Sequence, residues 1–386
     1  MDDTQAARTA PHALTRPKRF ENLDGLRGVA ALIVLIYHGV MVVPQFANPE
    51  FTGSGAGSWG WFDYSPLRVV LSGTEGVLVF FVLSGFVLTL PVLRTARYAW
   101  RAYYPSRLLR LYLPVGAALI WTVLVIVALP RNTLADDPSL YLQVHAEPLT
   151  ALKVARDAVL VDGVNDLNGP LWSLQWEVIF SLLLPLYVIL AVRLRQFWLS
   201  LVFVLAAVAA GATVAGIPSV TYLPAFAIGA LFAAALPRVE NVVARLNTGS
   251  RPKALWLTLS VVATLLLTAR WTLDPILAGP WLGTTMFAVL LGAALFVFIA
   301  MGSAGAKRIL TTPVVKWLGM ISFSLYLTHE PIVIGIAQLL PRELEQWSVV
   351  LSAPISVLVA WLFFRFVEKP SHRLSQLVKR GLTPRS

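Results

Sequence analysis

Cysteine is absent from this chain of 386 residues, and charged residues are scarce, at 13% of the total. The lack of cysteine excludes disulfide bonds and metal sites built on thiolates. Hydrophobic residues make up 57% of the chain, and the mean hydropathy is +0.71. Such a composition excludes a soluble globular domain and predicts an all-α, polytopic helical membrane protein.

The basic residues are not arranged for binding nucleic acid, despite a formal net charge of +11. They occupy short loops between apolar runs instead of one soluble face, so we expect no nucleic-acid partner. The sequence also lacks the inverted internal repeat that is typical of many transporters. No metal is expected, because none of the five histidines has a metal-ligand spacing; they are His12, His38, His145, His329 and His372.

Ten apolar runs are long enough to cross a bilayer, which takes about 20 residues in a helix. When the runs are threaded alternately, 25 of the 31 lysine and arginine residues fall on the side of the N-terminus. By the positive-inside rule, this asymmetry predicts about ten transmembrane helices in the inner (cell) membrane, with both termini cytoplasmic. The runs are 28–45, 74–93, 108–129, 170–191, 197–215, 220–236, 254–270, 281–301, 315–340 and 347–367.

The chain divides into a basic tail at 1–19, a membrane domain at 20–372 and a second basic tail at 373–386. The first apolar run is too long for a signal-peptide core and lacks a clear cleavage site, so we expect a retained anchor. About 20 residues follow Phe366, too few for a further domain. In the loop 130–169, apolar residues at helical spacing predict a short surface helix.

The first apolar run begins with charged residues and ends at His38. Arg27 and His38 are eleven residues apart, which places them on nearly the same helix face, about 16 Å apart along the axis. Ionisable side chains inside a span are costly and are functional candidates for that reason. The alternative is a histidine that is hydrogen-bonded within the core.

Arg107 and Arg110 are three residues apart at the start of the third run and share one helix face. With Arg27 and Arg101 they predict a basic cluster at the cytoplasmic surface. The planar guanidinium group suits phosphate oxygens, so a ligand with several phosphates would fit there. Anchoring of the loop to anionic lipid is the alternative.

Two later runs carry polar residues at helical spacing. In the fourth run Glu177 lies on one face with Ser173. Counted from the outer surface, it reaches a depth similar to that of His38, so we expect the carboxylate to orient the imidazole and to stabilise its cation. A structural tie between helices is the alternative. In the ninth run, Tyr326 and His329 belong to one polar stripe.

Six motifs in order resemble the membrane acyltransferase 3 family over about residues 20–372: LDGLRG followed by His38, FFVLSGF, RLLR, WSLQWE, SFSLYLTH and VEKP. The resemblance implies an integral membrane O-acyltransferase. In that family the acyl donor is usually cytoplasmic acyl-CoA, and the acceptor is commonly a carbohydrate hydroxyl. The histidine that matches His38 is the catalytic centre, and the pair that matches Arg107 and Arg110 is required.

From the residues and the resemblance together, we predict transfer of an acyl group, most simply acetyl, from acyl-CoA to a hydroxyl of a glycan, glycolipid or glycoside. The membrane lipid is the other expected partner. A proton-coupled transporter with a buried His/Glu pair is the alternative. The predicted site has His38 as general base or nucleophile and Glu177 as its orienting carboxylate; Arg27, Arg107 and Arg110 for the CoA phosphates; and Trp172, Tyr326 and His329 for the acceptor.

Overall fold

The computed structural model describes residues 20–52, 59–160, 167–277 and 279–383. These residues form helices and their connections, and no β-strand occurs among them. The all-α prediction is therefore confirmed for the described ranges. The predicted basic tail at 1–19 lies outside the described residues.

Each of the ten predicted apolar runs overlaps mainly with one long helix. The agreement follows from the length of the runs, because an apolar segment of this size has few ways to satisfy its backbone other than a helix. The helices are α1 (Glu21–Met41), α4 (Gly73–Leu93), α5 (Trp100–Ala128), α8 (Leu171–Leu194), α9 (Trp198–Val214), α10 (Pro218–Ala234), α12 (Pro252–Leu267), α14 (Met286–Gly302), α16 (Pro313–Leu339) and α17 (Ser348–Phe363).

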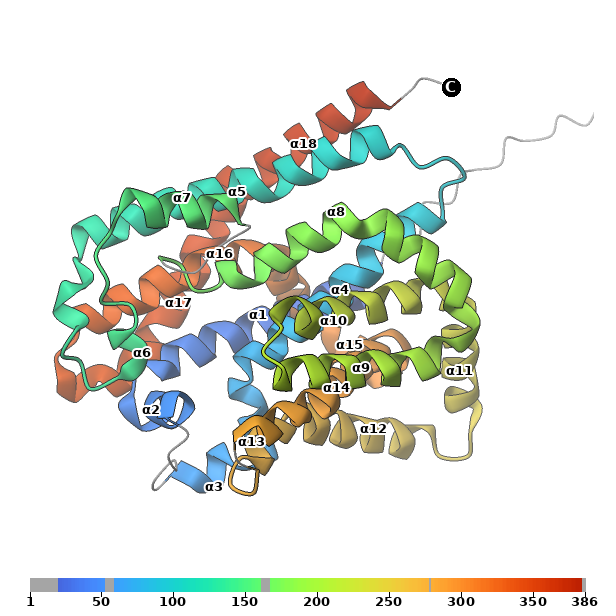
Figure 1. The fold of residues 1–386 in the computed structure, drawn as a ribbon, viewed down its shortest axis with the longest axis horizontal. Coiled ribbons are helices and arrows are strands. Elements are labelled where there is room, and N and C mark those ends of the chain that lie inside the picture. The colour runs from blue at the N-terminus through green and yellow to red at the C-terminus, as the bar shows by residue number, and fades with distance from the viewer. Residues whose placement is uncertain (1–19, 53–58, 161–166, 278, 384–386) are drawn as a thin grey trace, which may run out of the picture.

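Seven helical segments in the described part of the chain are long and apolar enough to cross a membrane. The number is lower than ten partly because α8, the turn η4 (Arg195–Phe197) and α9 run on as one segment of 44 residues, in which Figure 1 shows the chain reversing direction. In the same way α17 is continuous with α18 (Lys369–Leu382). The helices α10 and α11 (Leu236–Thr248) form a pair bent by 79°, and α12 is shorter than a full span. Ten spans and cytoplasmic termini thus stay predictions.

Short helices occupy the connections between the long ones. Figure 1 shows α2, α3 and α6 together at the lower left, and α11 at the right edge of the molecule. The surface helix predicted within the loop 130–169 is confirmed as α7. Thr150 caps its start, because the side-chain oxygen accepts a hydrogen bond from Lys153 N. The short elements are α2 (Pro44–Thr52), α3 (Gly60–Asp63), η2 (Pro66–Leu71), η3 (Arg131–Leu134), α6 (Leu140–Gln143), α7 (Ala151–Val159), α13 (Ala269–Leu273), η5 (Gly279–Thr285), α15 (Ala304–Leu310), η6 (Arg342–Trp347) and η7 (Phe364–Glu368).

The helix α1 packs directly against α4 and α16. Glycine allows the close approach: a Cβ on Gly28 would overlap the backbone of Gly319 in α16. In the same way, a Cβ on Gly85 in α4 would overlap the carbonyl of Phe226 in α10. Both contacts are in line with the use of small residues where membrane helices approach closely. These contacts hold α1, and the side chains it carries, in one position.

Candidate active site

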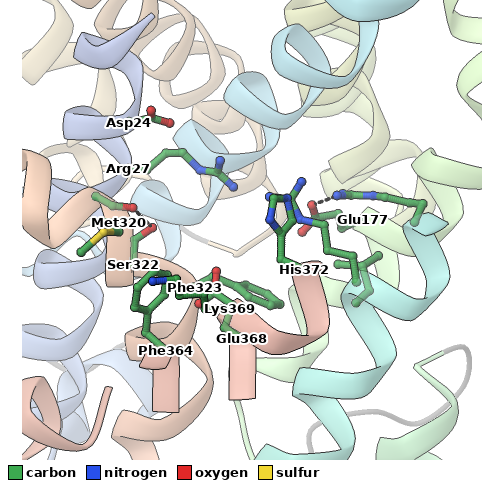
Figure 2. A pocket seen from close by; sticks show the side chains of 14 residues that line it. Asp24, Arg27, Glu177, Met320, Ser322, Phe323, Phe364, Glu368, Lys369 and His372 are labelled. Atoms are coloured by element: carbon green, nitrogen blue, oxygen red, sulfur yellow. Dashed lines mark hydrogen bonds and ion pairs between the residues drawn. The ribbon is translucent and has the colours of Figure 1, made fainter. Parts of the chain in front are cut away.

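Charged side chains from five helical elements surround a cavity of about 340 Å³, which we call the cationic chamber. Figure 2 shows Arg27 and His372 pointing toward one another across it. Basic groups outnumber acidic ones, so the chamber suits an anionic ligand. Its charged or titratable lining residues are Asp24, Arg27, Arg107, Arg110, Glu177, Glu368, Lys369 and His372.

The predicted basic cluster is present in the cationic chamber, where Arg27 from α1 meets Arg107 and Arg110 from α5. Arg101 is exposed and does not line the chamber. The Nε atom of Arg27 is buried and has no hydrogen-bond partner among the described residues. Because a buried donor without a partner is costly, an acceptor group of a ligand would relieve it.

Glu177 forms an ion pair with Arg107, and the Oε1–Nη2 distance is 2.5 Å. Ser181 Oγ accepts from Arg107 Nε at 3.2 Å, and Ser84 Oγ lies 3.5 Å from Glu177 Oε1. The expectation that Glu177 orients His38 is therefore wrong in its geometry. The carboxylate belongs to the cationic chamber.

The expected contact between Glu177 and His38 is absent because α8 begins deeper inside the protein than a start at the outer surface would place it. The chain before α8 already lies inside the protein, where Asn168 is fully buried. Asn168 Nδ2 donates to the Leu327 carbonyl of α16 at 3.0 Å and to Thr122 Oγ1 at 3.2 Å. Since α8 starts from this buried point instead of the outer surface, six further residues bring Glu177 to the level of Arg107.

His38 lines a second cavity, of about 320 Å³, which we call the histidine chamber. Its wall combines residues of α1, α2, α4, α8 and α16 with the connection that carries α6. The predicted acceptor residues Trp172 and Tyr326 both line it. His329, also predicted to contact the acceptor, is fully buried behind His38 and is not part of the wall.

Backbone carbonyls fix the proton positions of the two histidines. Nδ1 of His329 lies 2.8 Å from Leu325 O, and Nδ1 of His38 lies 2.9 Å from Val34 O. A carbonyl only accepts, so each Nδ1 carries a proton. The His38 Nδ1 proton is shared between the Val34 carbonyl and Nε2 of a neutral His329, which lies 3.1 Å away. Neutral His38 then has its basic nitrogen at Nε2.

Glu330 supplies the carboxylate of the histidine chamber. It is 1% exposed, and its Oε1 atom lies 3.8 Å from Nε2 of His38 and 3.3 Å from Nε2 of His145. Tyr141 donates to the same oxygen at 3.0 Å, and the Gly169 amide donates to Oε2. Burial, and next the carboxylate of Glu330, raises the pKa of Tyr141 well above its usual range, so its hydroxyl stays a donor.

A narrow cavity of about 40 Å³ lies between the two chambers. It shares four lining residues with the cationic chamber and two with the histidine chamber, so the three cavities lie next to one another in a row. The residues shared with the cationic chamber are Arg27, Glu177, Ser322 and Phe323, and those shared with the histidine chamber are Val77 and Tyr326.

Several residues of the two chambers were not predicted from the sequence. Glu330 directly follows His329 inside an apolar run, and its charge there was a usable signal. Glu368 and Lys369 lie within the VEKP motif. His145 and His372 gave no local signal, because only tertiary packing brings them to the chambers. In the described ranges, no group of three or more His, Cys, Asp or Glu side chains is arranged to hold a metal ion.

Comparison with known proteins finds a similar protein and a matching family. A protein described as "Putative peptidoglycan O-acetyltransferase YrhL", from Bacillus subtilis (strain 168), is 22% identical over an alignment of 400 positions. The alignment covers 93% of this chain and 56% of that relative, so the chain spans little more than half the relative's length. No solved structure gives a significant match. A family model for the acyltransferase domain matches residues 20–365, and the chain therefore belongs to the acyltransferase 3 family.

Proposed function

We propose that this chain is a membrane O-acyltransferase that moves an acetyl group from acetyl-CoA to a glycan hydroxyl. The donor's phosphates occupy the cationic chamber, and the acceptor enters the histidine chamber. One observation carries the proposal: a row of three adjacent cavities lies between a cluster of guanidinium groups and the imidazole of His38. Membership of the acyltransferase 3 family supports the same activity.

The donor is held by the guanidinium groups that face the cationic chamber. Arg27 and Arg110 contact phosphate oxygens, which suit the planar fork of arginine. Arg107 is already paired with Glu177, so it mainly shapes the wall. From there the thioester arm extends through the narrow cavity toward His38. The Arg27–His38 rise of about 16 Å along α1 is of the same order as such an arm.

Transfer takes place at Nε2 of His38. The acceptor oxygen attacks the thioester carbonyl carbon while Nε2 takes the hydroxyl proton. Glu330, 3.8 Å from this nitrogen, stabilises the imidazolium that forms. The tetrahedral intermediate then collapses, the carbon–sulfur bond breaks, and the CoA thiolate leaves with the proton from His38. Atoms and charge balance without a further reactant.

The acceptor is most simply a glycan of the peptidoglycan type, because a relative carries that substrate in its name. Trp172 and Tyr326 line the chamber and offer aromatic surface and a hydroxyl for a sugar. In this arrangement the cationic chamber and both termini face the cytoplasm, and the histidine chamber opens toward the outer side. The protein is then an inner-membrane enzyme whose donor and acceptor approach from opposite sides.

The test is purified full-length protein in detergent with acetyl-CoA labelled in the acetyl group. Soluble peptidoglycan fragments and chitooligosaccharides serve as acceptors. We expect free CoA and labelled sugar to appear together, in equal amounts. A proton-coupled carrier would bind or move a solute with no loss of thioester, and that outcome would reject the enzyme.

A further inference from the structure

We propose that His145 is a positioning residue for the transfer: it holds Glu330 ionised and directed at His38. The inference rests on the proposed function and adds a residue to it. His145 lies in the connection between α5 and α8, outside all six sequence motifs. Its side chain is 10% exposed and lines the histidine chamber.

The segment that carries His145 is fixed to the membrane helices. Ser139 Oγ donates to the Met41 carbonyl at 2.9 Å, which ties the start of α6 to the end of α1. In α2, Asn48 Oδ1 accepts from Leu140 N at 2.9 Å. The backbone that carries His145 is therefore fixed against α1 and α2, and this fixed backbone places the imidazole beside the buried carboxylate.

The contacts of His145 determine which of its nitrogens carry protons. Nδ1 lies 2.7 Å from the carbonyl of Tyr141, so it donates there. Nε2 lies 3.3 Å from Glu330 Oε1. A lone pair on Nε2 would face a negative oxygen, and only a proton makes the contact attractive. His145 is therefore the imidazolium partner of an ionised Glu330.

Other groups facing Glu330 do not replace this contact. Arg131 acts on the carboxylate only through its charge, since its Nη1 atom donates to the Leu167 carbonyl at 3.0 Å. Tyr141 and the Gly169 amide are neutral donors. The titratable or charged groups around Glu330 are His38 from α1, Arg131 from η3, Tyr141 and His145 from the α6 connection, and His329 and Tyr326 from α16.

The contact between His145 and Glu330 should affect the chemical step of the transfer. An ionised Glu330 stabilises the His38 imidazolium that forms during transfer, whereas a neutral Glu330 does not. Loss of the His145 cation should therefore lower kcat through Glu330. It should leave the KM for acetyl-CoA unchanged, because the donor's phosphates lie in the other chamber.

The test is a double-mutant cycle on the full chain in detergent, with labelled acetyl-CoA and chitooligosaccharide. We expect His145→Gln to lower kcat about tenfold, the scale of one hydrogen bond to a charged group. In a Glu330→Gln background the same change should have no further effect, because contacting residues that act through one another are not additive. His145→Lys, which retains a cation, should recover most of the activity.

Two outcomes overturn the inference: parental kcat in His145→Gln, or an equal loss from His145→Gln in both backgrounds. The second would mean that His145 acts on its own or through the loop's structure. If His145→Gln does not purify, His145→Lys against His145→Met gives the same comparison of cation with no cation. A parent that consumes no thioester refutes the proposed function itself, so the two failures are distinguishable.

Discussion

Nε2 of His329 lies 3.1 Å from Nδ1 of His38. The two imidazoles come from α16 and α1, and the carbonyls of Leu325 and Val34 fix the direction of the hydrogen bond between them. His329 therefore acts as an acceptor behind His38. The arrangement holds the ring of His38 with its basic nitrogen toward the histidine chamber.

His38→Ala removes the proposed base. We expect the rate of acetyl transfer to fall at least about 10²-fold, the usual contribution of a positioned general base. The variant should insert and purify like the parent, because His38 is partly exposed to the chamber. Labelled product formation per mole of purified protein is the measurement. Activity within a few-fold of the parent would remove His38 from the mechanism.

His329→Leu removes the acceptor behind His38 and keeps the volume of the core. The Val34 carbonyl still accepts from Nδ1 of His38, so the tautomer should survive with a looser ring. We expect kcat to fall about tenfold, the scale of one lost buried hydrogen bond, with little change in the KM for acetyl-CoA. A loss as large as that of His38→Ala would instead make His329 a direct participant.

Arg110→Ala should weaken binding of acetyl-CoA, because Arg110 lines the cationic chamber. We expect the donor KM to rise about tenfold at low salt and less at high salt, where charge interactions are screened. Arg110→Lys should recover the affinity only in part, since the planar fork is lost. Arg101→Ala is the matched control: it lies on the same helix, is exposed and does not line the chamber. An equal effect from both variants would indicate general surface charge.

The helices could be predicted from the sequence because long apolar runs have only one common solution in a membrane. The cluster of Arg107 and Arg110 was predictable for a similar reason, since their spacing alone places them on one face. Both inferences depend on neighbours along the chain. They needed no knowledge of how distant elements pack.

The sequence marks Glu330 as a charge inside an apolar run, but it does not show that this carboxylate, and not Glu177, lies beside His38. The depth count for Glu177 assumed that α8 begins at the membrane surface, and the buried contacts of Asn168 place that start inside the protein. The contact of His145 with Glu330 depends on a loop that docks through Ser139 and Asn48. Long-range contacts of this kind produce no periodicity or residue spacing in the sequence from which they could be predicted.

Tyr141→Phe removes a neutral donor to Glu330. Burial and the nearby carboxylate raise the pKa of Tyr141 well above its usual range, so the hydroxyl stays protonated between about pH 6 and 9. The loss should therefore be small, about threefold in kcat, and the same at every pH in that interval. Parent and variant pH–rate profiles are compared. A ratio that changes steadily with pH would show that the tyrosine ionises within the range.

Glu177→Gln tests the roles of the two chambers separately, because it removes a charge from the cationic chamber and leaves the histidine chamber unchanged. Glu177 pairs with Arg107 at 2.5 Å, so the variant leaves the cationic chamber more positive. We expect the KM for acetyl-CoA to fall about threefold at low salt, with the difference lost at high salt. The pH dependence of kcat should keep the parent's position, because Glu330 is the carboxylate near His38.

The companion variant is Arg107→Ala, which leaves Glu177 partly buried without its cation. A carboxylate stripped of its partner is costly, so Arg107→Ala should lower the yield of folded protein, and adding Glu177→Gln should restore it. The pH profile of Glu177→Gln is the decisive curve. If its acidic limb moves to lower pH while the donor KM stays constant, the carboxylate supports His38 after all, and the ion pair with Arg107 is not its working state.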